Sequence, residues 1–457
     1  CARASAEGAS LPRSPSDEPP PNKLVEDGRV VLVAGAGVLA LEAVALVSGG
    51  LFNVLGLELP PAVAGFILAT AALMVAPAKM AKAVSKALEP AHSVLERYTG
   101  LIFVPYIVLL FTSGLPPGAE LVRGLAACAA SWLVVTTATA WTVSIAENMA
   151  TGRAASEATE STSSEEKEEE AELSACPSGA ISLLDSVFSL GTCVAVSFLL
   201  GGPFLLLRRA ALRGGIAAAT RASLVVPLRL MGTVAVYRAA QRVPVLGGLF
   251  PTLISGAIVA ISLLASGGAS AVELYMRSAG AALLWMVTPS IVACSLSAYY
   301  SRKALSANVV PLLAGLVVGV PMAMATGALM ARVFGLSEAV GMATLAKHNM
   351  SRFAVEIANA LGVSPGLACA ACVVTGILGV CVLPPLLDVL GIRSQLARGV
   401  AAGASSHGAG TLGLAARGEA EASAFASTTF ALGGAVAVLL VSIAPFRSVL
   451  LALAGYA

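Results

Sequence analysis

The chain has 457 residues, of which 57% are hydrophobic and only 12% are charged, and its net charge is +2. A soluble domain carries about 25% charged residues, so a chain of this composition cannot cover its surface with polar groups. The 28 basic and 26 acidic residues form no basic stripe, which argues against nucleic acid as a partner. We therefore expect an all-α polytopic membrane protein surrounded mainly by lipid.

The first segment, residues 1–28, is polar, rich in Pro and Ser, and has no hydrophobic run. It begins with Cys, and we expect the natural N-terminus to lie upstream. Its composition fits a disordered tail left from an organelle transit peptide, and a plain disordered tail fits nearly as well. A membrane module is then expected over 29–147, with these spans: Val30–Val47, Ala62–Ala76, Leu101–Ser113 and Leu125–Ile145.

An acidic linker is expected over residues 148–180. It contains STSSEEKEEEAE at 161–172, with six Glu against one Lys and no apolar face, so it has to stay in water. A larger membrane module is expected over 181–457. Its spans are 181–207, 217–237, 250–266, 279–299, 307–334, 338–361, 364–391, 396–416 and 424–455, which brings the total to about twelve crossings.

The larger module contains similar segments about 115 residues apart. FPTLISGAIVAISLL (250–264) resembles SPGLACAACVVTGIL (364–378), and MVTPSIVACSL (286–296) takes the place that GASSHGAGTLG (403–413) holds later. Transporters build inverted halves around a midplane site in this way. We expect an inverted repeat with interrupted helices, in which Thr288-Pro289-Ser290 matches the break at SSHGAGTLG.

Two glycine patterns resemble dinucleotide-binding loops. GAGVLA at 35–40 follows VVLV, but another apolar span comes next where a second strand and a crossover helix would be required. Open sheet edges are not tolerated in lipid. We expect Gly35 and Gly37 to lie at a helix–helix contact.

The second pattern, SSHGAGTLG at 405–413, places several polar groups inside an apolar region. Its glycines allow the backbone to bend, and a broken helix here would present N–H donors and the positive end of a dipole to an anion. A tightly packed helix crossing with a satisfied histidine is the alternative. The candidate ligand groups are Ser405, Ser406, His407, Gly408, Gly410 and Thr411.

A third polar cluster lies in TLAKHNMSRFAVEIANALG, residues 344–362. An unpaired Lys near the bilayer centre costs about 2.5–3.5 kcal/mol, so Lys347 has to be paired, to reach an interface, or to hold an anion. Lys347 and Ser351 are four residues apart, a spacing that would put the ammonium and the hydroxyl on one face of a helix. Asn349 and Glu356 belong to the same cluster, and a surface loop is the alternative interpretation.

These segments resemble known membrane families. LAKHNMSRFAVEIANALG, MVTPSIVACSLSAYYSRK and the region around SSHGAGTLG resemble the LrgB/CidB family over about 181–457. LELPPAVAGFILATAALMVAPA and LERYTGLIFVPYIVLL look like the LrgA/CidA family. A fusion of both is characteristic of the plastidal glycolate/glycerate translocator family, which implies exchange of these photorespiratory acids across the chloroplast inner envelope.

The resemblance also implies site residues, with the family's lysine at Lys347 and its SSH segment at Ser405, Ser406 and His407. The chain departs from the family pattern over 348–352, which leaves the substrate preference open. We expect a secondary transporter in which Lys347 and the N–H groups near 406–410 hold the carboxylate. Thr288 and Ser290 would bind the hydroxyl, and His407 and Glu356 are candidates for a coupled proton.

The alternatives are a holin-like protein that controls permeability and a transporter of another monocarboxylate such as pyruvate. No Ser/His/Asp order, HExxH or paired carboxylates stand out, so we expect no enzyme activity, cofactor or metal. Cys369 and Cys372 form a C-x-x-C in an apolar segment and are expected to pack as small hydrophobes. Small carboxylates and lipid are the expected partners, and a homo-oligomer is left open.

Overall fold

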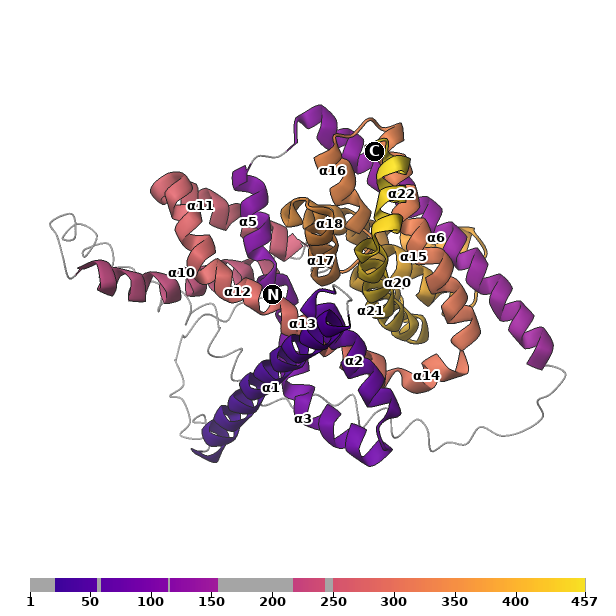
Figure 1. Ribbon diagram of the computed structural model, residues 1–457, viewed down its shortest axis with the longest axis horizontal. Coiled ribbons are helices and arrows are strands. Elements are labelled where there is room, and N and C mark those ends of the chain that lie inside the picture. Colours follow the sequence, from indigo (N-terminus) through magenta and orange to yellow (C-terminus); the bar gives the residue numbers. More distant parts are fainter. Residues whose placement is uncertain (1–20, 56–58, 114–115, 155–216, 243–249, 457) are drawn as a thin grey trace, which may run out of the picture.

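The computed structural model describes residues 21–55, 59–113, 116–154, 217–242 and 250–456 (Figure 1). These residues form helices and contain no strand, which confirms the all-α prediction for the described ranges. A helix satisfies its backbone groups internally, as an apolar environment requires. The expected span 181–207 and the acidic run 161–172 lie outside the described residues.

The N-terminal half contains two long helices and a set of shorter ones between them. α1 starts at Pro21, inside the segment expected to be a tail, and α6 continues to Ala154, past the expected module boundary. The helices are α1 (Pro21–Val54), α2 (Pro61–Val75), α3 (Ala78–Arg97), α4 (Thr99–Ile102), α5 (Val104–Ser113) and α6 (Gly118–Ala154).

The C-terminal half is built from long helices alternating with short or bent ones. They are α10 (Ala217–Gln241), α11 (Phe250–Tyr275), η3 (Met276–Gly280), α12 (Ala281–Trp285), α13 (Val287–Tyr300), α14 (Arg302–Ala307), α15 (Val309–Val333), α16 (Glu338–Ala343), η4 (Thr344–Ala346), α17 (Ser351–Leu361), α18 (Pro365–Cys381), α19 (Leu383–Val389), α20 (Gln395–Ala415), α21 (Ala420–Ser442) and α22 (Ala444–Ala454).

Five helical stretches of the described residues are long and apolar enough to cross a membrane, and two bent helix pairs raise this number to seven. The bent pairs are α3 with the helices over 99–112, at 62°, and α18 with α19, at 53°. The protein is thus a multi-pass membrane protein. The count of about twelve crossings and the inverted repeat stay predictions.

The two halves share one hydrophobic core. Leu41, Phe66 and Trp132 from the N-terminal half belong to the same buried cluster as Ile291 and Val400 from the C-terminal half. α6 packs against α15 and α20, α2 against α13, and α5 against α11. α10 and α11 lie on the opposite side of the molecule from α6 (Figure 1). Side chains of the first half can therefore reach the polar segments of the second.

Two helices are broken at a single residue with almost the same backbone conformation. α20 is broken at His407 (φ 46°, ψ −144°) and α11 at Gly268 (φ 61°, ψ −147°). The expected break at SSHGAGTLG is therefore present. At its expected counterpart, the helix is interrupted at Met286, between α12 and α13, and Thr288-Pro289-Ser290 lies in the first turn of α13. A missing N–H at Pro289 leaves no helical bond unmade there.

The glycines of GAGVLA lie inside the continuous helix α1, which contains no strand. A Cβ on Gly37 would come within 2.7 Å of the Cβ of Ala91 on α3, so Gly37 marks a close helix contact as predicted. A Cβ on Gly35 would have no atom of the described residues within 4 Å, so the predicted helix contact of Gly35 is not present among them. One small residue is enough where two helices cross at a single point.

Candidate functional site

Two helices begin beside each other at the centre of the C-terminal half. Residues 347–350 are not helical, and α17 begins at Ser351 with Met350 as its N-cap. The second part of α20 begins at Gly408, after the break at His407. A Cβ on Gly408 would lie 3.3 Å from the Cε of Met350, so the two helix starts are in contact.

Small residues let α20 bend and pack at this point. A Cβ on Gly410 would come within 2.8 Å of the carbonyl oxygen of Ala402, in the preceding part of the same helix. A Cβ on Gly403 would meet Thr429 of α21 at 2.7 Å. His407 is the one non-glycine residue of the described chain with positive φ, and such a conformation costs about 1–3 kcal/mol.

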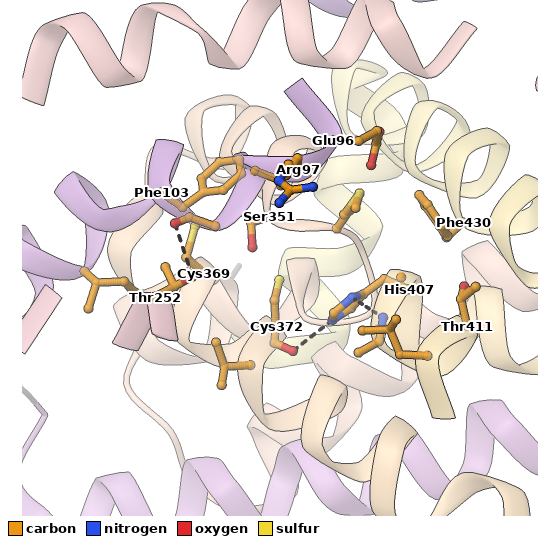
Figure 2. Close-up of a pocket in the computed structure, with 18 of the residues that line it drawn as sticks. Glu96, Arg97, Phe103, Thr252, Ser351, Cys369, Cys372, His407, Thr411 and Phe430 are labelled. Atoms are coloured by element: carbon orange, nitrogen blue, oxygen red, sulfur yellow. Dashed lines mark hydrogen bonds between the residues drawn. The ribbon is translucent and has the colours of Figure 1, made fainter. Parts of the chain in front are cut away.

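A cavity of about 500 Å³ lies in front of the two helix starts. Figure 2 shows the side chains around it, with His407 and Thr411 from α20, Ser351 from α17, and Glu96 from α3. Of the residues predicted to bind substrate, four line it: Ser351, His407, Gly408 and Thr411. Both helix N-termini therefore border the same space, which favours a negative charge there.

The hydrogen bonds around the cavity leave one hydroxyl unused. His407 Nε2 lies 3.0 Å from the carbonyl oxygen of Cys372, which holds the imidazole against α18 (Figure 2). The Oγ1 of Thr411 is buried and has no hydrogen-bond partner among the described residues. A buried hydroxyl without a partner costs about 1–3 kcal/mol, so Thr411 gains most from a polar ligand. Cys369 and Cys372 are free, buried thiols in the same wall, as their apolar setting predicted.

Lys347 lies away from this cavity. Its side chain is buried, and its Nζ donates to the carbonyl oxygen of Thr344 at 3.1 Å. A Cβ on Gly327 of α15 would come within 2.8 Å of Nζ, so the ammonium packs against that helix. No salt bridge to Lys347 is present among the described residues.

The residues just before the break in α20 also face inward and are satisfied by protein groups. Ser405 Oγ donates to the carbonyl oxygen of Ala401 at 2.8 Å, and Ser406 Oγ accepts from Trp132 Nε1 at 2.7 Å. The ring of His348 lies between Ser131 Oγ at 3.2 Å and the carbonyl oxygen of Ser405 at 3.0 Å. Polar groups of α6 thus take the hydrogen bonds that a substrate was expected to take.

The remaining predicted residues are dispersed. Asn349 lines a separate, very small cavity, and Gly410 lies behind the cavity wall against α20 itself. Ser290 Oγ donates to the carbonyl oxygen of Val287 at 2.7 Å, and Thr288 is half-buried nearby on α13. Glu356 is half-buried on α17 and is not among the residues that line the main cavity.

The structure adds an ion pair that was not predicted. Arg352 is fully buried and its Nη1 lies 2.9 Å from Glu96 Oε1, whose side chain is 34% exposed. Nη1 also donates to the carbonyl oxygen of Ser290 at 2.7 Å, and Nη2 donates to Thr99 Oγ1 at 2.5 Å. Glu96 and Thr99 line the cavity, so the N-terminal half supplies part of its wall.

Helix α3 is attached to the C-terminal half through three side chains on one face. His92 Nε2 lies 2.9 Å from Ser297 Oγ, and Tyr300 OH donates to Glu89. Glu89, His92 and Glu96 are three and four residues apart and therefore share one side of the helix. That spacing is visible in the sequence, and it could have identified α3 as a partner of a polar surface.

Residues 233–446 match the model of the LrgB-like family. The chain is 30% identical over 178 residues to plastidal glycolate/glycerate translocator 1, chloroplastic, of Arabidopsis thaliana, an alignment that covers 39% of this chain and 35% of that protein. It is 32% identical over 126 residues to the uncharacterized protein YxaC of Bacillus subtilis (strain 168), which covers 28% of this chain and 55% of that protein. The chain therefore spans about a third and about half of the lengths of these two relatives. No solved structure matches.

Proposed function

We propose that this chain, whose residues 233–446 belong to the LrgB-like family, is a secondary transporter that exchanges glycolate and glycerate. The setting we propose is the chloroplast inner envelope, in photorespiration. The similarity to the Arabidopsis translocator motivates the substrate class and the location. The cavity bordered by two helix N-termini is the observation that carries the proposal.

The cavity suits a small 2-hydroxy acid for three reasons. The N–H groups that start α17 and the second part of α20 supply hydrogen-bond donors and positive dipole ends for a carboxylate. Thr411 Oγ1 is an unsatisfied hydroxyl that can bond the substrate's own hydroxyl or carboxylate. A volume of about 500 Å³ lies within the usual range for small-molecule sites. Ser351 provides a further hydroxyl in the same wall.

The substrate and transport mode are tested together by counterflow. Purified protein in liposomes preloaded with unlabelled glycolate, glycerate, pyruvate or lactate is offered labelled glycolate. We expect saturable uptake that is fastest against internal glycolate and glycerate. Preference for pyruvate would redirect the substrate assignment, and non-saturable flux that is indifferent to the internal acid would indicate a holin-like pore instead.

Thr411→Val tests the site itself. Removing the hydroxyl should raise the KM for glycolate roughly fivefold to tenfold, which corresponds to one hydrogen bond of about 1 kcal/mol. Thermal stability should stay equal or increase, because valine removes a buried hydroxyl that has no partner. Thr137→Val is the matched control, since Thr137 Oγ1 bonds only to its own helix on an exposed face. An unchanged KM in Thr411→Val would remove Thr411 from the binding site.

A further inference from the structure

We propose that Glu96 is a built-in carboxylate that occupies Arg352 while the cavity is empty, and that the substrate's carboxylate replaces it there. This inference rests on the proposed function and adds the residue that holds the transported anion. It also gives the N-terminal half a direct role in transport.

Arg352 carries its charge in a buried position. The side chain is fully buried, and an arginine does not lose its proton in proteins. A buried charge without a partner is strongly unfavourable. Glu96 is its partner among the acidic groups described, so this one carboxylate keeps the empty site stable.

The guanidinium of Arg352 has one N–H group that its partners do not use. Glu96 Oε1 lies 2.9 Å from Nη1. Nη1 also donates to the carbonyl oxygen of Ser290 and to Cys294 Sγ, and Nη2 donates to Thr99 Oγ1. Nε of Arg352 is buried and has no hydrogen-bond partner in the part of the chain that the structure describes. A carboxylate that binds arginine with both oxygens uses two neighbouring N–H groups. Glu96 contacts Nη1, so it does not use the edge formed by Nε and Nη2. A carboxylate that binds with both oxygens would use the unpaired Nε–H at that edge.

Residues next to Arg352 line the cavity. Glu96 and Thr99 line the cavity, and so do Met350 and Ser351, which directly precede Arg352. Glu96 lies in the last turn of α3, just before the 62° bend that follows Arg97. Its side chain is 34% exposed, whereas that of Arg352 is 0% exposed. Arg352 itself is not among the residues that line the cavity. The proposal therefore requires the more exposed partner, Glu96, to turn away so that the substrate can reach the guanidinium.

Charge balance then separates two modes of transport. In exchange, only the substrate-loaded protein has to switch between the two sides of the membrane, and in that state the substrate neutralises Arg352. Net flux also requires the empty protein to switch back, and in the empty state Glu96 neutralises Arg352. Glu96 also competes with substrate for the same guanidinium, so its removal should tighten substrate binding.

The test compares Glu96→Gln with wild type in liposomes, with labelled glycolate measured both as exchange and as net efflux into substrate-free buffer. We expect Glu96→Gln to retain exchange and to lose most of the net efflux. The KM for glycolate in exchange should fall about tenfold, which is a coupling of ordinary size between competing groups. Glu273→Gln is the matched control. It removes the carboxylate of the exposed Glu273–Arg277 pair, at 2.7 Å, and should alter neither measurement.

Arginine variants complete the test. Arg352→Lys should raise the KM because an ammonium cannot bind a carboxylate as a planar fork. The double variant Glu96→Gln with Arg352→Gln removes both charges, leaves no buried ion, and should fold yet fail in both modes. Thermal unfolding of each purified variant verifies folding.

Two results would overturn the inference while leaving the proposed function intact. One is a Glu96→Gln protein with an unchanged KM and an unchanged ratio of efflux to exchange. The other is a double variant that transports as wild type does. Wild-type protein that exchanges no small carboxylate would instead reject the proposed function, and the inference with it.

Discussion

Two polar clusters meet at the break in α20, and they differ in what surrounds them. The cavity face consists of Ser351, His407, Gly408 and Thr411, which line the main cavity. The packed face consists of Lys347, His348, Ser405 and Ser406, which are buried and bonded to protein groups. Both clusters look alike in sequence, but a cavity wall suits a ligand, whereas groups bonded to the protein suit a rigid scaffold. Lys347 is the exception in the packed face, because its ammonium has a carbonyl acceptor but no salt bridge among the described residues.

The largest effect that separates the two faces is expected at the break itself. His407 adopts a backbone conformation that disfavours every residue with a Cβ, and its ring bonds the carbonyl oxygen of Cys372. His407→Ala keeps the strain of about 1–3 kcal/mol and loses the bond, so α20 should straighten and exchange should fall by about tenfold or more. His407→Gly removes the strain and should retain most of the exchange.

Counterflow measures exchange in both variants. Exchange reports the effect of the backbone break separately from any proton transfer by the imidazole. Exchange of like anions moves no net proton, so a proton carried by the imidazole would appear only in net flux. Equal loss of exchange in His407→Gly and His407→Ala would show that the imidazole contacts the substrate. The cavity face would then depend on that side chain more than on the bend.

A smaller effect, on stability alone, is expected for Trp132→Phe on the packed face. The change removes the Nε1–H that donates to Ser406 Oγ at 2.7 Å and leaves a small void. We expect a loss of about 1–2 kcal/mol in unfolding free energy, with an unchanged KM for glycolate. Trp141→Phe on the same helix is the control, since Trp141 is 57% exposed. A raised KM in Trp132→Phe would place the packed face in contact with substrate.

Composition alone was enough for the helical class, because a chain with 12% charged residues has few other ways to satisfy its backbone. The break at SSHGAGTLG was also predictable, since it combines four polar side chains with closely spaced glycines. Which of its residues line the cavity was not predictable. The chain turns at His407 through a positive φ, so helical spacing no longer relates Ser406 to Thr411.

The residues that the N-terminal half contributes to the cavity wall could not be predicted from local sequence patterns either. Thr99 and Arg352 are 253 positions apart, and nothing in either segment specifies its partner. Arg352 was visible as a charge in an apolar helix, but the same observation applied to Lys347. Only packing decides that one charge meets a carboxylate in a cavity wall and the other meets a carbonyl oxygen behind it.

Lys347→Met is expected to have the smallest effect, and it tests the comparison most directly. Methionine has a similar length, and replacing a buried ion with an apolar side chain of similar volume is often neutral or stabilising by about 1 kcal/mol or more. Because Nζ reaches Thr344 and Gly327 rather than the cavity, we expect an unchanged KM and equal or higher thermal stability. Lys82→Met, at an exposed position of α3, is the control. Loss of exchange in a stably folded Lys347→Met protein would show instead that Lys347 holds the anion, as the sequence pattern predicts. The ammonium would then have to reach the cavity in another conformation of residues 347–350, and the two faces would be two states of one site.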